Sequence, residues 1–560
     1  MSPSDPVTRP EPEADQHYDA VVVGAGFGGL RMLHELRGLG LRTLVVDEAD
    51  DVGGTWHWNR YPGCRTDSES WYYCYSFSPE LEKEWQWSER FPAQGEVAEY
   101  LRFVADRLDL RRDIRFGTRV EAAEFDDDAN LWRLRTDVGD VVSATYYVAA
   151  QGILSAPYLP NFPGIDTFDG EVLFTPRWPH DRGLDFAGKR VAIVGTGATG
   201  VQLVPVVSRT AEAVTVFQRT ATYVVPSRNH VLEDVQRIEL DRDRDAMWKR
   251  TELHPMALPY PPSAGRLGVD LDDEERRRAL EAGWERGTFR FMFEMFDDMM
   301  TDPEINKVVA DFVRDKIRSI VTDPETAELL CPDDHGVGSK RPPLGQHYYE
   351  AFNRDNVELV SVKKTPISEI TPRGIRVGDD EYEFDVIIFA TGFDAVTGGF
   401  TRVDVRGRSG ASLAERWADG PETLLAMAVD DFPNFFMILG PQGPYAILTV
   451  VIEHTAQWIG QAIAAARDAG TDRIEARPDA VSSWNQEVLD AVAPTMAVRG
   501  SESWLFGANI PGKARVVQQY FGGFHKWLAK IRDESAAGFP HFSRSTSADD
   551  TAAGDERRAS

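Results

Sequence analysis

The sequence predicts an α/β fold with two Rossmann-like dinucleotide-binding domains, the second inserted into a discontinuous first one, and a mostly helical cap insertion. Two apolar runs that each lead into a glycine motif predict the paired domains. The motifs are GAGFGG at residues 24–29 and GTGATG at residues 195–200. Residues 226–330 predict the cap, because they are charged, mostly helical in pattern and interrupt the alternation of strands and helices.

Composition narrows the classes of function. The chain has 560 residues, enough for several domains, and 61 basic against 90 acidic residues give a formal charge of −29. This charge would repel nucleic acids and anionic membrane surfaces, so we expect neither as a partner. The three cysteines form no CxxC pair, which argues against a metal site and suits the cytoplasm. There is no apolar run of about 18 residues, so we expect no membrane span. We expect a monomer or weak homo-oligomer.

The first glycine motif predicts a strand, a tight turn and a helix. Gly24 would allow the turn, Gly26 would let the backbone approach a pyrophosphate, and Gly29 would let the helix pack on the strand. The next apolar run ends in Asp47, where this fold carries the acid that binds a ribose 2′-hydroxyl. An acid here would repel a 2′-phosphate, so the site favours FAD or NAD over NADP. The simpler alternative is a glycine-rich turn without a ligand.

Residues 53–63, GGTWHWNRYPG, place glycines beside Trp56 and Trp58. This pattern indicates backbone pressed against a flat aromatic ligand or, equally, a surface loop with aromatic core residues. A helix is expected over 96–108, followed by a strand meander over 114–120, 132–136 and 143–150. The proline-rich segment 156–164 is typical of a linker out of the first domain.

The second glycine motif inverts the cofactor preference. The apolar run after it ends in Gln-Arg-Thr and carries no acid. Arg219 would bind a 2′-phosphate through two hydrogen bonds and Thr220 would donate another, so this fold favours NADP. A single arginine is more often solvated, but the position directly after the second strand favours the phosphate. The cofactor-binding residues expected in the motif itself are Gly195, Thr196, Gly197 and Gly200.

Two features stand out in the cap. Asp302 followed by Pro303 predicts the start of a helix, with the aspartate as N-cap and the proline in the first turn. The stretch FRFMFEMF at residues 289–296 would suit a cavity for a bulky apolar substrate, since Met and Phe side chains adapt to such ligands. Such a cluster is more often simply core.

The apolar run 386–389 leads into ATGFD and predicts the return of the chain from the second domain to the first. The predicted boundaries are 17–155 and 390–540 for the FAD-binding domain, 165–225 and 331–389 for the NADP-binding domain, 226–330 for the helical insertion, and disordered tails at 1–16 and 541–560.

Taken together, these motifs resemble one family, the type I Baeyer-Villiger monooxygenases, which are FAD- and NADPH-dependent class B flavoprotein monooxygenases. The resemblance runs from about residue 17 to 530. Besides the glycine motifs it rests on GGTWHWNRYPG with Asp67, FQRT, KR at Lys340 and Arg341, FNRDN, ATGFDA, and WLFGANIPGK with Trp504. It implies that NADPH reduces FAD, that O2 forms a C4a-peroxyflavin, and that a bulky or cyclic ketone becomes an ester or lactone.

The resemblance also implies site residues. Arg341 would stabilise the peroxyflavin and the oxyanion, because a guanidinium stays charged without acting as an acid, and Asp67 would pair with it. Positions that match family FAD contacts are Asp47, Thr55, Trp56, Asp67, Tyr73 and Val120, besides Gly24, Gly26, Phe27 and Gly29 of the first motif. Positions that match NADP contacts are Arg219, Thr220 and Lys340, with Trp504 closing over NADP and substrate.

The chain departs from the family fingerprint F-x-G-x-x-x-H-x-x-x-W-P at one position. It has FDGEVLFTPRWP, where Phe174 replaces the histidine and the other named positions match. A phenyl ring neither titrates nor hydrogen-bonds, which leaves N- or S-oxygenation open as an alternative, although the closing Trp-Pro favours ketone oxygenation. Two further alternatives are an NADPH-dependent flavin reductase, which would need a cysteine pair beside the flavin, and a non-catalytic NADP-binding sensor.

Overall fold

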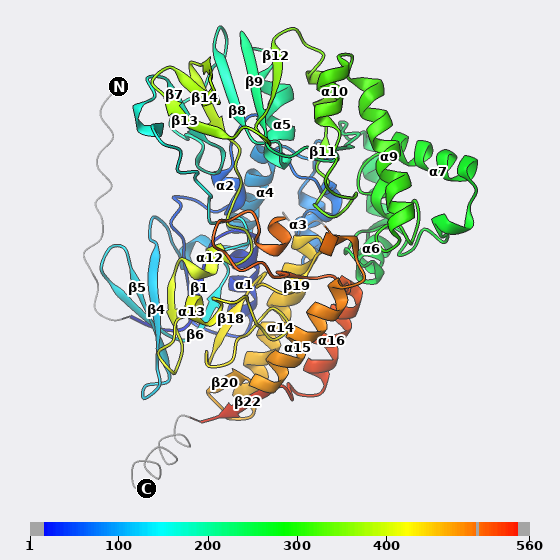
Figure 1. Ribbon diagram of the computed structural model, residues 1–560. Helices are drawn as coiled ribbons and strands as arrows, with labels where there is room; N and C mark the ends of the chain where they lie inside the picture. The colour runs from blue at the N-terminus through cyan, green and yellow to red at the C-terminus, as the bar shows by residue number, and fades with distance from the viewer. Residues whose placement is uncertain (1–15, 500–502, 547–560) are drawn as a thin grey trace.

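The computed structural model describes residues 16–499 and 503–546. Figure 1 shows two strand-rich bodies, one above the other, with the cap helices to one side and three long C-terminal helices against the lower body. The predicted fold class is confirmed, because each glycine motif follows a strand whose neighbours are parallel to it, in a sheet of its own with helices packed on it.

The larger sheet forms around the first glycine motif. It has eight strands in the order β17-β4-β5-β6-β1-β2-β3, with β18 beside β6. β1 pairs in parallel with β2 and β6, whereas β4, β5 and β6 form an antiparallel meander. The strands are β1 (Gln16–Val23), β2 (Thr43–Val46), β3 (Ile114–Arg115), β4 (Val120–Asp126), β5 (Leu131–Thr136), β6 (Val141–Ala149), β17 (Asp404–Arg406) and β18 (Phe435–Met437). The sheet therefore draws on two stretches of chain far apart in sequence.

The first meander strand is shifted from its predicted place. A strand was expected over 114–120, but β3 is short and β4 begins only at Val120. The intervening backbone is used elsewhere, since Gly117 N donates to Ala49 O and Thr118 N donates to Asp47 O. These bonds tie the segment to the loop after β2, so it cannot pair with β5.

Helices cover this sheet on the side of the glycine motif. Three of them, α1, α14 and α16, pack in sequence against one another, and Gly460 of α14 lets α1 approach closely at Glu35. The helices of this body are α1 (Phe27–Gly38), α2 (Thr55–Trp58), α3 (Pro79–Glu84), α4 (Gln94–Arg107), α12 (Gly398–Thr401), α13 (Leu413–Arg416), α14 (Leu448–Asp468), α15 (Pro478–Val492) and α16 (Phe524–Ala536).

The second sheet is five-stranded, in the order β12-β9-β8-β16-β7, and all its pairings are parallel. Helix α5 (Ala198–Val207) follows its central strand β8. The strands are β7 (Glu171–Phe174), β8 (Arg190–Val194), β9 (Ala213–Gln218), β12 (Val357–Ser361) and β16 (Val386–Phe389). A small antiparallel sheet lies beside it, and the remaining elements of this part are β13 (Ile367–Thr371), β14 (Gly374–Val377), β15 (Asp380–Glu383), β10 (Val225–Pro226), β11 (Leu344–Gly345) and α11 (Tyr348–Ala351).

The cap is helical, as the pattern predicted. Asp302 caps α9 by accepting hydrogen bonds from the backbone N–H groups of Glu304 and Ile305. The FRFMFEMF segment is mostly core, since Phe291 and Met295 are buried. The cap helices are α6 (Asp234–Leu253), α7 (Asp273–Arg286), α8 (Arg290–Phe293), α9 (Pro303–Ile320) and α10 (Pro324–Leu330).

The predicted disordered tail from residue 541 is wrong at its start. Strand β22 (Phe542–Ser545) pairs antiparallel with β20 (Arg473–Ala476). Phe542 is buried and its ring lies 5.6 Å from that of Trp458, which gives this short segment an apolar anchor. Residues 1–15 and 547–560 lie outside the described residues, and the domain boundaries stay a prediction.

No helix in the described ranges is both long and apolar enough to cross a bilayer. Within the same ranges, no group of three or more His, Cys, Asp or Glu side chains is arranged to hold a metal ion.

His254 marks the junction between the cap and the first domain. It directly follows α6, is 1% exposed, and its Nδ1 accepts a hydrogen bond from Met256 N at 3.0 Å. The neighbouring backbone joins the two parts, because Ile447 N donates to Met256 O and Phe524 N donates to Pro255 O. Burial, with a smaller effect of His525, lowers the pKa of His254 from 6.5 to about 3.

We therefore expect acid to weaken this junction. The folded pKa lies below the unfolded one, so the neutral imidazole contributes fully above pH 6.5 and its contribution is lost as the pH falls toward 3. At pH 5 the loss is about 2 kcal/mol. Thermal unfolding at pH 7.5 and pH 5 measures it. His254→Asn can accept the same hydrogen bond but does not titrate, so this variant should lose less Tm on acidification; equal losses in both proteins would contradict the prediction.

Candidate active site

An ion pair between Arg341 and Asp67 forms the centre of the site. Arg341 Nε and Nη2 both donate to Asp67 Oδ2, at 2.9 and 2.7 Å. Asp67 lies in the loop after α2, whereas Arg341 lies just before β11, so the pair joins segments 274 residues apart. The two side chains are 25% and 34% exposed, which leaves the pair reachable by a ligand.

Aromatic rings surround the guanidinium. The Phe289 ring centroid lies 4.8 Å from Arg341 Cζ, and that of Tyr445 lies 5.9 Å away. Tyr445 in turn stacks on Phe521, with centroids 5.3 Å apart. Phe289 opens the FRFMFEMF segment, so this segment contributes one ring to the site and buries most of the rest. The sequence had not indicated Tyr445 or Phe521; the former follows β19 (Gly443–Pro444) and the latter follows β21 (Gln519–Tyr520), which pair in parallel.

The charge on Arg341 is fixed. Burial by itself lowers the pKa of Arg341, but the charge and hydrogen bonds of Asp67 and the contact with Tyr445 outweigh it, so the pKa rises above the ordinary value of an arginine. Burial raises the pKa of Tyr445, although Arg341 opposes this shift, so the phenol is neutral at pH 7. The site therefore holds a permanent cation beside a neutral hydroxyl group.

Three more of the predicted residues, Trp56, Tyr73 and Phe27, contact one another near the ion pair. Trp56 Nε1 donates to the Tyr73 hydroxyl at 3.1 Å, and the Tyr73 ring lies 5.4 Å from that of Phe27. Burial raises the pKa of Tyr73, and the charges of Asp67 and Arg341 also act on it, in opposite directions. The start of α1 is thus connected to the ion pair through Tyr73. Thr55 is the first residue of α2, next to Trp56.

The first glycine turn is too tight for side chains at its key positions, so a ligand there would meet the backbone directly. Gly24 has φ +110°, and a Cβ there would lie 2.5 Å from Ala150 O. A Cβ on Gly29 would lie 1.7 Å from Gly24 O, so helix and strand touch directly. Gly26 faces Gly54 closely, and α1 begins with no acidic residue in its first turn. An open helix N-terminus without acids fits a pyrophosphate.

The second turn repeats this construction. Gly195 has φ +113°, and a Cβ there would lie 2.5 Å from Ala390 O. A Cβ on Gly200 would lie 2.3 Å from Gly195 O, whereas Gly197 has open space beside it. Helix α5 also begins without an acidic residue in its first turn. Both turns therefore fit the diphosphate of a dinucleotide.

Asp47 does more than the sequence suggested. It directly follows β2, and its carboxylate accepts hydrogen bonds from Ala25 N in the glycine turn and from Ala49 N. Burial raises its pKa, and these two bonds oppose the shift. Asp47 thus braces the turn as well as lying where the ribose acid is expected. Val120, the first residue of β4, is 3% exposed and offers its backbone only.

Two of the predicted 2′-phosphate residues, Arg219 and Thr220, directly follow β9, which pairs with the strand that leads into the second turn. Arg219 directly follows β9 and is exposed, and Thr196 Oγ1 donates to Thr220 O at 3.0 Å. Lys340 precedes Arg341 and is half-buried. The placement of Lys340 against a phosphate stays a prediction.

Trp504 lies on a loop that is fixed to the domain crossover. It begins the short helix η7 (Trp504–Phe506). Further along this loop, Asn509 Nδ2 donates to Phe393 O at 2.8 Å and Lys513 Nζ contacts Asp394 Oδ1 at 2.5 Å. The motifs WLFGANIPGK and ATGFDA, far apart in sequence, are therefore in direct contact.

Phe174, at the fingerprint histidine position, belongs to the second sheet. It ends β7, and its ring stacks on Phe389 of β16 with centroids 5.4 Å apart. His180, a few residues later, instead contacts the first domain, where its ring lies 4.9 Å from that of His57 and 5.7 Å from that of Trp58.

Two dinucleotide folds that meet near an accessible arginine–carboxylate pair define a two-nucleotide flavoenzyme. A family model for flavin-binding monooxygenase-like proteins matches residues 18–233. The chain is 44% identical to a Baeyer-Villiger monooxygenase of Pseudooceanicola batsensis, over 95% of this chain and 97% of that protein. It is 40% identical to phenazine N-monooxygenase of Lysobacter antibioticus, over 94% of this chain and 97% of that protein. The crystal structure of cyclohexanone monooxygenase from Rhodococcus sp. Phi1 bound to NADP+ has TM-score 0.92 and 41% identity, over 95% of this chain and 100% of that one.

The chain therefore belongs to the Baeyer-Villiger monooxygenase family of flavin-binding monooxygenases. The family predicted from the sequence motifs is confirmed.

Proposed function

We propose that this enzyme uses NADPH, FAD and O2 to insert one oxygen atom next to the carbonyl group of a bulky or cyclic ketone, which gives an ester or lactone. The observation that carries this proposal is the fixed, accessible cation of Arg341, held by Asp67 where the two dinucleotide folds meet. Family membership supports the reaction class, and it makes FAD and NADPH the cofactors.

FAD, when bound, supplies electron transfer from NADPH and activation of O2. The residues that would hold it are Gly24, Gly26, Phe27, Gly29, Asp47, Thr55, Trp56, Asp67, Tyr73 and the Val120 backbone. Those that would hold NADPH are Gly195, Thr196, Gly197, Gly200, Arg219, Thr220, Lys340 and Trp504.

The protein's own contribution to the reaction is electrostatic. Attack on a ketone moves negative charge onto the carbonyl oxygen, and a preorganised cation stabilises that charge. Arg341 supplies the cation and, because its pKa is raised, gives no proton to a basic oxygen. Arg341 donates two hydrogen bonds to Asp67, which orients the guanidinium, and the rings of Phe289 and Tyr445 lie beside it.

An oxygen-isotope experiment tests the reaction. The FAD-loaded enzyme, NADPH and 18O2 are incubated with a panel of cyclic and steroid-like ketones, and products are analysed by mass spectrometry. We expect esters or lactones that carry one 18O atom, with one NADPH consumed per product. NADPH oxidation that yields only hydrogen peroxide with every ketone would refute the proposal.

N-oxygenation is a second candidate. Phe174 replaces the fingerprint histidine, and a relative at 40% identity is named for N-oxygenation of a phenazine. The same isotope assay with phenazines and sulfides in place of ketones separates the two reactions, because an N-oxide or sulfoxide carries the label on the heteroatom.

We propose that Arg219 binds the 2′-phosphate of NADPH. Arg219→Ala should raise the KM for NADPH about 10- to 100-fold, because a charge-assisted bond to phosphate is lost, and leave the KM for NADH unchanged. Steady-state kinetics with both nucleotides measures this. Arg209→Ala, an exposed arginine just after α5, is the matched control and should behave as the parent enzyme. Equal changes for NADPH and NADH in Arg219→Ala would argue against the assignment.

We further propose that the enzyme is a monomer or weak homo-oligomer of the cytoplasm. Sedimentation velocity over a range of protein concentrations tests the first part, and fractionation of the source cells tests the second.

A further inference from the structure

A buried carboxylate lies two residues after Asp67, at the border between the first domain and the cap. The side chain of Glu69 is 1% exposed and precedes the short helix η1 (Ser70–Tyr72). Arg90 Nη2 donates to Glu69 Oε1 at 2.9 Å, and the Tyr72 hydroxyl donates to Oε2. The Tyr260 hydroxyl lies 2.7 Å from Oε1 and 2.9 Å from Oε2. Burying a charge is costly unless the charge is paired and hydrogen-bonded, and Glu69 meets both conditions.

Tyr260 brings the cap to this carboxylate. It lies between α6 and α7, so its bond to Glu69 joins segments 191 residues apart. Burial, together with Glu69, raises the pKa of Tyr260 well above its ordinary value. Arg290, whose Cζ lies 4.1 Å from the centre of the Tyr260 ring, and a hydrogen bond with Thr288 oppose this shift without cancelling it. The phenol is therefore neutral at pH 7 and donates its hydrogen to the carboxylate.

The cap residues that contact Tyr260 are the two neighbours of Phe289. Thr288 and Arg290 directly flank Phe289 in the chain. The Phe289 ring lies 4.8 Å from Arg341 Cζ. Thr288 is fully buried and has φ +59°, which β-branched residues rarely adopt, so its surroundings must hold this backbone in place. The contacts of Tyr260 thus reach the segment that packs beside the active-site guanidinium.

Arg341 contacts both of the segments that this network joins, because it binds Asp67 in the first domain and packs against Phe289 in the cap. We propose that Glu69 and Tyr260 are positioning residues, which fasten the cap to the first domain and so fix the orientation of the Arg341 guanidinium. They act through Arg341 alone. This inference rests on the proposed function, because the orientation of this cation affects catalysis only if negative charge develops beside it.

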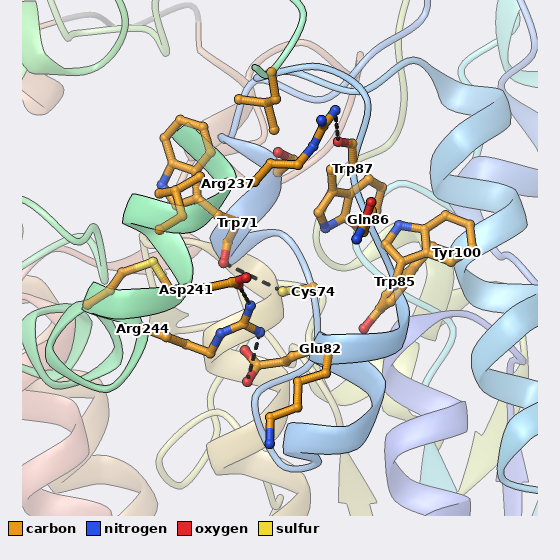
Figure 2. A pocket seen from close by; sticks show the side chains of 15 residues that line it. Trp71, Cys74, Glu82, Trp85, Gln86, Trp87, Tyr100, Arg237, Asp241 and Arg244 are labelled. Carbon is orange, nitrogen blue, oxygen red and sulfur yellow. Dashed lines mark hydrogen bonds and ion pairs between the residues drawn. The ribbon is translucent and has the colours of Figure 1, made fainter. Parts of the chain in front are cut away.

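A second bridge between the same two parts of the protein provides a matched control. Glu82 of α3 accepts a hydrogen bond from Trp248 Nε1 of α6 at 2.8 Å. It also pairs with Arg244 at 3.3 Å, a contact drawn as a dashed line in Figure 2. The Glu82 side chain is 5% exposed, so this bridge also depends on a buried carboxylate. Helices α3 and α6 carry no residue that we assign to the active site.

Tyr260→Phe keeps the ring and removes the hydroxyl group. In the FAD-loaded enzyme with NADPH, O2 and a ketone, the kcat for ester formation should fall about tenfold, because a small displacement of a positioned group is enough for such a loss. The KM for NADPH should stay at the parental value. The share of NADPH electrons that ends in hydrogen peroxide should rise.

Trp248→Phe removes the donor of the second bridge and should keep the parental kcat and peroxide share. A parental kcat in Tyr260→Phe, or an equal loss in Trp248→Phe, would overturn the proposal. If Tyr260→Phe does not yield folded, yellow protein, Glu69→Gln takes its place, because it removes the charge at the centre of the network and keeps the size of the side chain. It should lower kcat in the same way, and an unchanged kcat would again overturn the proposal.

The Arg341→Lys background separates positioning from a general loss of stability. Lysine has no planar guanidinium to orient, so adding Tyr260→Phe to this variant should lower its ester formation less than about twofold. A general loss of stability would instead lower the activity of both backgrounds alike. A tenfold loss in both would therefore refute the positioning role.

Crystal structures of the parent and Tyr260→Phe test the geometry without turnover. The Phe289 ring should lie farther from Arg341 Cζ in the variant than the 4.8 Å of the parent, and Trp248→Phe should keep the parental distance. An unchanged distance in Tyr260→Phe would contradict the inference. A parent enzyme that forms no ester from any ketone would refute the proposed function, whereas a displaced ring in Tyr260→Phe would still support the role of Glu69 and Tyr260 in orienting the guanidinium.

Discussion

Replacement of Arg341 by alanine should lower the rate of ester formation by about 100- to 1000-fold, the usual effect of removing a group that stabilises a developing oxyanion. The structure gives the reason, because Arg341 is the cation that Asp67, Phe289 and Tyr445 hold in place. FAD content, read from the visible absorbance of the purified protein, should stay at the parental level. NADPH oxidation should continue, with its electrons released as hydrogen peroxide.

Arg341→Lys is the informative control. Lysine keeps the positive charge but cannot donate two hydrogen bonds in the fixed geometry of a guanidinium, and it can act as an acid. We expect it to recover part of the lost activity. Near-parental conversion of ketone by Arg341→Ala would remove Arg341 from the mechanism, whereas loss of FAD from this variant would assign it a structural role.

The second large effect is expected from a pair of glycine substitutions. Gly29→Ala would place a Cβ 1.7 Å from Gly24 O, so α1 must move away from β1 and the affinity for FAD should fall about 100-fold or more. Gly200→Ala would place a Cβ 2.3 Å from Gly195 O in the other domain. It should give yellow protein with a raised KM for NADPH.

Two measurements separate these outcomes: the FAD content of the purified variants and their NADPH kinetics. Gly38→Ala, at the end of α1, is the control for the helix, because a Cβ there meets nothing within 4 Å. It should leave both quantities unchanged. If Gly29→Ala retained its FAD, or Gly200→Ala lost it, the assignment of the two cofactors to the two turns would be wrong.

Much of the fold could be predicted because its signals are local. Each glycine motif, its flanking strand and the residue after the next strand lie within a short stretch of sequence, so Asp47 and Arg219 were identified without the structure. Short elements with few apolar residues were not predictable. Strand β22 carries one buried anchor, Phe542, and its partner strand lies far away in sequence, which gives no periodic signal.

Local sequence patterns predicted less of the candidate site than of the fold. Nothing in the sequence around Asp67 indicates that it meets Arg341, and only the resemblance to a family suggested the pair. Tyr445 and Phe521 were missed, and Phe289 was indicated only as part of an apolar segment, because contact with a guanidinium depends on tertiary packing.

The two glycine turns have the same backbone geometry, and this similarity affects how cofactor preference could be re-engineered. In each turn the same contact recurs, between the first glycine and the carbonyl of an alanine that follows the returning strand, Ala150 or Ala390. Steric fit therefore does not discriminate between the two nucleotides. We propose that selectivity resides instead in the side chains that follow the second strand of each fold. On this assignment, a change of electron donor toward the cheaper, unphosphorylated nicotinamide would call for edits at Arg219 and Thr220 and none in the turn.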